Sequence, residues 1–186
     1  MNLEWDINYE FSFNTYYPIN LQIIFEIPIK EGRQVYMQHS LEFDSKGFII
    51  ILDTKKFIKI WRKSKNDSRI PNYHIGDEKL WRTDYKFHSA EQGFEDGKKN
   101  PVPVTTGIDC IGKFPNCNVS FNDGVTRTIW LLANGAEYFP IVVPDMDSAI
   151  IFQSNAGKDR CPFYSCTWLY EQWLDENENL LPITPK

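Results

Sequence analysis

The sequence lacks most of the patterns that assign a protein to a class at once. No run reaches the roughly 18 uninterrupted apolar residues of a transmembrane helix. The N-terminal MNLEWDINYE has neither the basic start nor the apolar stretch of a signal peptide. A formal net charge of −5 argues against a protein that coats nucleic acid with its whole surface, but it permits a local basic groove. We therefore expect a cytoplasmic protein with no membrane insertion.

Metal and redox patterns are also scarce. The spacing of the four cysteines differs from the paired C-x-x-C of zinc sites, and only three histidines could assist them. The residues are Cys110, Cys117, Cys161 and Cys166, with His39, His74 and His88. Buried free thiols are favoured over a zinc site or a disulfide, and no metal site is predicted.

The chain of 186 residues is long enough for one domain with its own core, and its first part reads as strands. The stretches INLQIIFEIPI and GFIIIL are rich in β-branched and aromatic residues, and Glu31-Gly32 and Lys46-Gly47 are typical of turns. The next stretch, DTKKFIKIWRKSK, predicts a helix capped by Asp53. Its lysines and arginine, from Lys55 to Lys65, form either a solvated face or a patch for phosphates or an acidic partner.

The middle of the chain predicts a loop, a short helix and an extended segment. Residues 64–86 are polar and rich in turn formers, so they read as a loop. HSAEQGFEDG predicts a short helix with Ser89 as N-cap, Gln92 at the capping-box position and Gly97 as terminator. NPVPV must then be extended, because each proline excludes the residue before it from the helical region.

A charged residue in an unfavourable place marks the next unit, NVSFNDGVTRTIWLLANGAEYFPIVV. It predicts a strand, a glycine turn, a helix from about Thr126 to Asn134 that stops at Gly135, and a second strand. Arg127 falls in the first turn of that helix, where the macrodipole disfavours a cation by a few tenths to about 1 kcal/mol. A bound anion would explain the arginine, and so would an ion pair with Asp123, Glu91 or another carboxylate.

The order of these elements resembles the ParB/sulfiredoxin fold, in which a helix precedes a PxxV strand and a glycine turn leads into an arginine-bearing helix. More closely, KFIKIW, KFHSAEQGFEDGKKNPVPV and FNDGVTRTIWLLANGAEYFPI resemble the plasmid fertility inhibition factors. The resemblance spans about residues 48–143 and implies an α+β fold with a small mixed sheet and short helices. We expect a β-rich N-terminal extension at 1–47, a ParB/sulfiredoxin-like core at 48–143 and an aromatic-rich C-terminal extension with an acidic tail at 144–186.

The resemblance implies a nucleotide site at the glycine turn. Gly124 allows close approach of a phosphate, the helix start supplies N–H donors, and Arg127 can bind phosphate oxygens in a bidentate manner. The expected phosphate-binding residues are Asp123, Gly124, Thr126, Arg127 and Thr128. The expected cofactor is ATP or another nucleotide, with Mg²⁺ as the metal that would accompany it.

Catalysis would need a carboxylate at that site. The resemblance places a catalytic acid in the helix before NPVPV, so Glu91 is the first candidate and Glu95, one turn further on, is the second. Where sulfiredoxins have a cysteine and a histidine before the arginine, this chain has Val125 and Thr126, which excludes that thiol chemistry. SNAGKDR lacks the first glycine and the Ser/Thr of a P-loop and is rejected as one.

Two functions stay open at this point. The chain resembles an inhibitor of conjugative DNA transfer that uses nucleotide-dependent ATPase or DNase chemistry on the transfer DNA or at the type IV coupling protein. Alternatively, it is a non-catalytic module that docks on the coupling protein or on the type IV secretion machinery. A kinase on the same fold is a weaker third. The aromatic C-terminal segment CTWLYEQWLDENENLLPITPK fits either a core or a protein-binding face.

Overall fold

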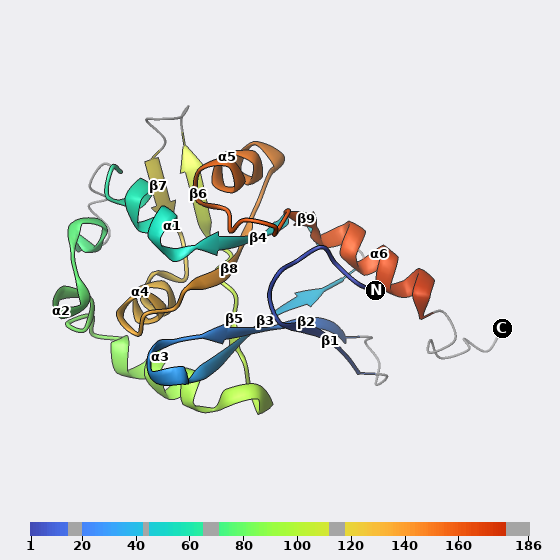
Figure 1. The fold of residues 1–186 in the computed structure, drawn as a ribbon, viewed down its shortest axis with the longest axis horizontal. Helices are drawn as coiled ribbons and strands as arrows, with labels where there is room; N and C mark the ends of the chain where they lie inside the picture. Colours follow the sequence, from blue (N-terminus) through green and yellow to red (C-terminus); the bar gives the residue numbers. More distant parts are fainter. Residues whose placement is uncertain (15–19, 43–44, 65–70, 112–117, 178–186) are drawn as a thin grey trace.

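The computed structural model describes residues 1–14, 20–42, 45–64, 71–111 and 118–177. Cys117, Lys65 and the acidic tail beyond residue 177 lie outside these ranges. The fold is α+β, with sheets of four, three and two strands and helices placed around them (Figure 1). Among the described residues, no helix has the length and apolarity needed to cross a membrane.

The largest sheet is mixed and has the strand order β1-β2-β3-β5. The strands β1 (Tyr9–Asn14), β2 (Asn20–Pro28) and β3 (Gln34–Leu41) form an antiparallel meander. The short strand β5 (Val102–Pro103) joins the free edge of β3 in parallel, with Met37 opposite Val102. The prediction of an extended NPVPV is confirmed, and its prolines lie at a sheet edge, where a missing N–H is tolerated.

The second sheet is built around β4 (Phe48–Asp53), which lies between β8 (Tyr138–Val143) and β9 (Tyr164–Ser165). The side chains of Ile49, Ile50, Ile51 and Leu52 are all fully buried, so this strand is a continuous apolar run rather than an alternating one. Figure 1 shows α1 (Thr54–Trp61) and α5 (Met146–Ala156) on one side of this sheet and the four-stranded sheet on the other. The small third sheet pairs β6 (Ile108–Ile111) with β7 (Asn118–Phe121).

Helix α4 (Val125–Ala133) is the most buried helix described. The residues from Thr128 to Ala133 are all buried, as expected for a helix that is apolar on every side. Helices α2 (Glu78–Trp81) and α3 (Phe87–Glu95) pack on it, and Trp130 stacks on Phe94 with ring centroids 4.2 Å apart. The predicted stop at Gly135 is confirmed, because this residue has a φ of 69°.

Two predictions about the middle of the chain were wrong in detail. Residues 71–86 are not only loop, because they contain α2 and the 3-10 turn Tyr73–Ile75. Ser89 is not an N-cap, because α3 begins two residues earlier, at Phe87. The buried Phe87 ring and the hydrogen bond from the Phe87 amide to the Asp84 carbonyl (3.0 Å) start the helix there. By contrast, the Asp53 cap of α1 is confirmed, since its side chain accepts from the Lys56 amide at 2.8 Å.

The three predicted segments share their sheets and one hydrophobic core. Strand β5, from the middle segment, completes the sheet of the N-terminal segment, and β9, from the C-terminal segment, pairs with β4. Helix α6 (Cys166–Glu176) contributes Leu169 and Trp173 to the core, so this side of the aromatic segment is core rather than a protein-binding face. Trp168 is 39% exposed and stacks on Tyr164 with centroids 5.1 Å apart.

Candidate functional site

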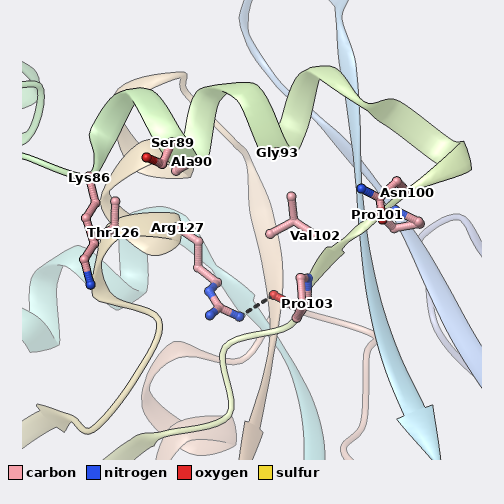
Figure 2. A pocket seen from close by; sticks show the side chains of 10 residues that line it. All are labelled: Lys86, Ser89, Ala90, Gly93, Asn100, Pro101, Val102, Pro103, Thr126 and Arg127. Atoms are coloured by element: carbon pink, nitrogen blue, oxygen red, sulfur yellow. Dashed lines mark hydrogen bonds between the residues drawn. The ribbon is translucent and has the colours of Figure 1, made fainter.

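Two adjacent hollows meet at the first turn of α4, and both are lined by Lys86, Thr126 and Arg127. The first, which we call the α3–β5 hollow, has a volume of about 300 Å³. Its other walls come from α3 and from the approach to β5: Ser89, Ala90, Gly93, Asn100, Pro101, Val102 and Pro103 (Figure 2). The second, the α4 hollow, has a volume of about 290 Å³ and is completed by the glycine turn: Asn122, Asp123, Gly124 and Val125.

The two hollows differ in chemistry. The α3–β5 hollow has mostly apolar walls, whereas the α4 hollow is lined by polar side chains and by the backbone at the helix start. The amides of a first helical turn have no intrahelical acceptor and carry the positive end of the macrodipole. With Lys86 and Arg127 beside them, the α4 hollow is suited to an anion.

The guanidinium of Arg127 is held in place from two directions. Its Nη1 donates to the carbonyl of Pro103 at 2.8 Å and to that of Val104 at 3.2 Å, and its Nη2 forms an ion pair with Asp123 Oδ2 at 2.9 Å. Figure 2 shows the side chain extending from α4 toward the strand that carries Pro103. Arg127 is 21% exposed and Asp123 is 62% exposed, so the carboxylate lies on the solvent side of the pair. Solvent competes for such a pair and a phosphate could replace it.

Gly124 is required by the chain itself. Its φ is 84°, and a Cβ at this position would lie 2.5 Å from Thr105 Cγ2. The Thr105 hydroxyl is in turn 3.3 Å from that of Thr128, and both residues are buried. Thr128 therefore lies in the core and lines neither hollow, while Thr126 lines both.

Asp84 ties the segment before α3 to the first turn of α4. Its Oδ1 accepts from the Lys86 amide at 2.9 Å and from Thr126 Oγ1 at 3.2 Å, and its Oδ2 accepts from the Tyr73 hydroxyl at 2.8 Å. Burial, with the hydrogen bond and the charge of Asp84, raises the pKa of Tyr73 to about 12, so that hydroxyl remains a donor at neutral pH. Sequence reasoning missed both Asp84 and Lys86, because no motif distinguishes them within a polar stretch.

The structure does not bring Glu91 or Glu95 to these hollows. The hollow-lining residues of α3 are Ser89, Ala90 and Gly93, and Gly93 follows the other two by four and three residues, so they share one side of the helix. At about 100° per residue, Glu91 and Glu95 fall on the opposite side. Glu91 is 39% exposed and lies 3.4 Å from His88 Nδ1. Asp123 is thus the carboxylate that lines the α4 hollow. Within the described residues, no group of three or more histidines, cysteines or acids could hold a metal ion.

A second polar surface lies on α1 and the two residues after it, none of which lines either hollow. Lys55, Lys59, Arg62 and Lys63 are exposed there, whereas Lys56 forms an ion pair with Asp159 at 2.7 Å and donates to the Gly157 carbonyl. The exposed cations are named here the α1 basic face. Elsewhere, Cys161 and Cys166 are buried free thiols, as predicted, and burial raises the pKa of Cys166 to about 12.

Comparison with known proteins places the chain in a family. The model of the plasmid fertility inhibition factor family matches residues 49–157, which contain both hollows, and the chain belongs to this family. It is 27% identical over 139 residues to the protein osa of Shigella flexneri, a match that covers 73% of this chain and 69% of that protein. A solved structure titled as a gold(I) cyanide derivative of the oncogenic suppression activity protein, a plasmid fertility inhibition factor, has the same fold. Its TM-score is 0.71 at 21% identity, over 94% of this chain and 86% of that one.

Proposed function

We propose that this protein inhibits the conjugative transfer of a plasmid and that it does so by binding a phosphate-bearing ligand, a nucleotide, in the α4 hollow. The family match supports the first part. One observation carries the second: two cations, Arg127 and Lys86, line one hollow together with the glycine turn and the first turn of α4. No carboxylate pairs with Lys86 among the described residues, so its charge is available.

In this proposal Asp123 is an internal competitor for the ligand. The carbonyls of Pro103 and Val104 fix one edge of the Arg127 guanidinium, and the other edge faces the Asp123 carboxylate. A phosphate entering the α4 hollow would take the place of that carboxylate on Nη2. Asp123 would then be released toward solvent, where it could hold a nucleotide-bound Mg²⁺, a metal that commonly keeps several waters and takes one or two carboxylates.

Hydrolysis of the nucleotide or cleavage of DNA is a further hypothesis. It requires a carboxylate at the reacting phosphate, and Asp123 lines the α4 hollow, whereas Glu91 and Glu95 line neither hollow. An assignment of Glu91 as the catalytic acid therefore requires α3 to rotate or shift when ligand binds. An ATPase or DNase assay of Glu91→Gln beside Asp123→Asn would separate the two assignments.

Calorimetry with ATP and with CTP, each with Mg²⁺, tests the phosphate site. Arg127→Ala should weaken binding about 10- to 100-fold, the range expected for hydrogen bonds to a charged partner. Asp123→Asn, which removes the internal competitor at nearly constant shape, should strengthen the binding of inorganic pyrophosphate supplied without metal. Absence of binding by the folded wild-type protein would refute the nucleotide site.

The docking alternative is favoured by a different observation, the α1 basic face, and by the fact that Arg127 already has protein partners. A conjugation assay in donor cells separates the two. If the hollow matters, Arg127→Ala should restore plasmid transfer, whereas Lys59→Glu with Arg62→Glu should not. The reverse pattern would favour docking on an acidic surface of the coupling protein or the secretion machinery.

A further inference from the structure

Tyr85 stands out because a large aromatic ring is left almost wholly in solvent. Its exposed fraction is 85%, the highest among the exposed large apolar side chains of the described residues. Isolated exposed apolar residues are ordinary, so exposure alone would imply nothing. The position of the ring gives it significance.

The ring lies beside a residue that lines both hollows. Lys86 Nζ lies 5.3 Å from the centroid of the Tyr85 ring, and Lys86 lines both hollows. The residue before Tyr85 is Asp84, whose hydrogen bonds to Tyr73, Lys86 and Thr126 tie this turn to the first turn of α4. Tyr85 is thus an exposed ring on a well-anchored turn, and its backbone position relative to Arg127 is set before any ligand arrives.

An exposed aromatic face beside Lys86, which shares the lining of both hollows with the second cation Arg127, matches the chemistry of a nucleoside phosphate. Bases stack on exposed aromatic rings with little dependence on sequence, while lysine and arginine bind the phosphate. The ammonium of Lys86 lies near the ring, and because Lys86 also lines both hollows, a rotation of its side chain would bring the ammonium to a phosphate bound there. A free nucleotide and a nucleic-acid strand share this chemistry.

We propose that Tyr85 stacks on the base of a nucleoside phosphate whose phosphate group lies between Lys86 and Arg127. This inference rests on the proposed phosphate site and adds to it the part of the ligand that the site does not explain. In this arrangement the base lies outside on the Tyr85 ring, so the apolar α3–β5 hollow does not bind it.

Calorimetry with three probes tests the proposal: inorganic pyrophosphate, ATP and a short oligo(dT) strand. Tyr85→Ala should weaken the binding of ATP, or of the strand, by at least tenfold, which is about 1.4 kcal/mol, and leave pyrophosphate binding unchanged. Tyr85→Phe should bind as the wild type does, because stacking needs only the ring. Weaker binding of ATP would assign the base to a free nucleotide, and weaker binding of oligo(dT) would assign it to a nucleic-acid strand.

Two matched controls remove an exposed apolar side chain elsewhere, Ile75→Ala on the turn before α2 and Trp168→Ala on α6. Neither should change any of the three affinities. Equal binding by wild type and Tyr85→Ala, with pyrophosphate still bound, would overturn the stacking proposal and leave the phosphate site intact. No binding of any probe by the wild type would overturn both. An Ala90→Leu variant that loses ATP while Tyr85→Ala keeps it would place the base in the α3–β5 hollow instead.

Discussion

At the scale of single residues, Arg127 shows how a locally unfavourable position becomes a favourable one. The macrodipole disfavours a cation in the first helical turn, but the guanidinium reaches away from the helix axis to two carbonyls and to Asp123. Three acceptors therefore offset the local cost, and the same contacts fix the orientation of the side chain. A preorganised guanidinium loses little conformational entropy when a phosphate binds.

His39 makes stability depend on pH. Burial lowers its pKa to about 4, from an ordinary 6.5, so the folded protein binds fewer protons than the unfolded chain between these values. The stability linked to neutral His39 is complete above pH 6.5 and is lost as the pH falls toward 4, by at most about 3 kcal/mol. Urea unfolding at pH 8 and pH 4.5 should show this loss in the wild type and a smaller one in His39→Gln.

The exposed histidine provides the control for that measurement. His88 is 77% exposed, so His88→Gln should keep the full pH dependence of the wild type. His39 Nε2 lies 3.6 Å from Cys166 Sγ, and the high pKa of that thiol keeps it neutral throughout this range. An identical pH profile for wild type and His39→Gln would show that His39 is not the group responsible.

At the scale of elements, α4 is fixed at both ends by residues far away in the sequence. Thr105 packs against Gly124 at its start, and Lys30 covers Gly135 at its end, where Lys30 Nζ donates to the Ala133 carbonyl at 3.0 Å. A cation is favourable at a helix C-terminus, so Lys30 also complements the macrodipole. The helix that carries Thr126 and Arg127 is thereby held in one position relative to both larger sheets.

Gly124→Ala should destabilise the protein by more than about 2 kcal/mol, because a positive φ and a 2.5 Å contact with Thr105 combine. The matched control is Gly97→Ala. Gly97 also has a positive φ, of 65°, but a Cβ there would meet nothing within 4 Å, so only the backbone cost of roughly 1 kcal/mol applies. Urea unfolding of both variants measures the difference, and equal losses would show that Thr105 moves aside.

Element boundaries followed from the sequence where a local signal sets them. Asp53 before α1, Gly135 after α4, and Pro101 and Pro103 at β5 act on their own neighbours, so their effects could be predicted without the fold. Helix α2 has only four residues, too few for an apolar period to show, and Ser89 resembled a cap although tertiary burial of Phe87 starts α3 earlier. The side of α3 on which Glu91 lies depends on how α3 packs against α4 and β5, which no local signal encodes.

At the scale of the whole molecule, the sheets join segments that composition alone would separate. Met37 pairs with Val102 and Ile50 with Ile141, so each larger sheet needs strands from distant parts of the chain. Cross-strand pairing over such distances depends on the complete fold. Strands of similar apolar composition carry no local sequence signal that specifies which strand they pair with. The α3–β5 hollow inherits its shape from this arrangement, since one of its walls is the β5 edge.

Deleting residues 1–41 should therefore prevent folding of the remainder. The deletion removes the partner strand of β5 and core side chains that are fully buried, among them Phe25 and Met37. We expect the truncated chain to show no cooperative thermal transition by circular dichroism and to be digested rapidly by a protease. Supplying residues 1–41 as a separate peptide provides the control, since it should restore protection; a cooperative transition without it would contradict the shared core.

The central place of β4 also sets an order on biosynthesis. This strand leaves the ribosome well before its partners, which are β8 and, at Ser165, β9. At about 5 to 20 residues per second, Ile49 to Leu52 wait on the order of ten seconds before both edges can be covered. Throughout that interval the nascent chain presents an apolar strand with at least one free hydrogen-bonding edge, and a cell that makes this protein must keep that strand from pairing with strands of other chains.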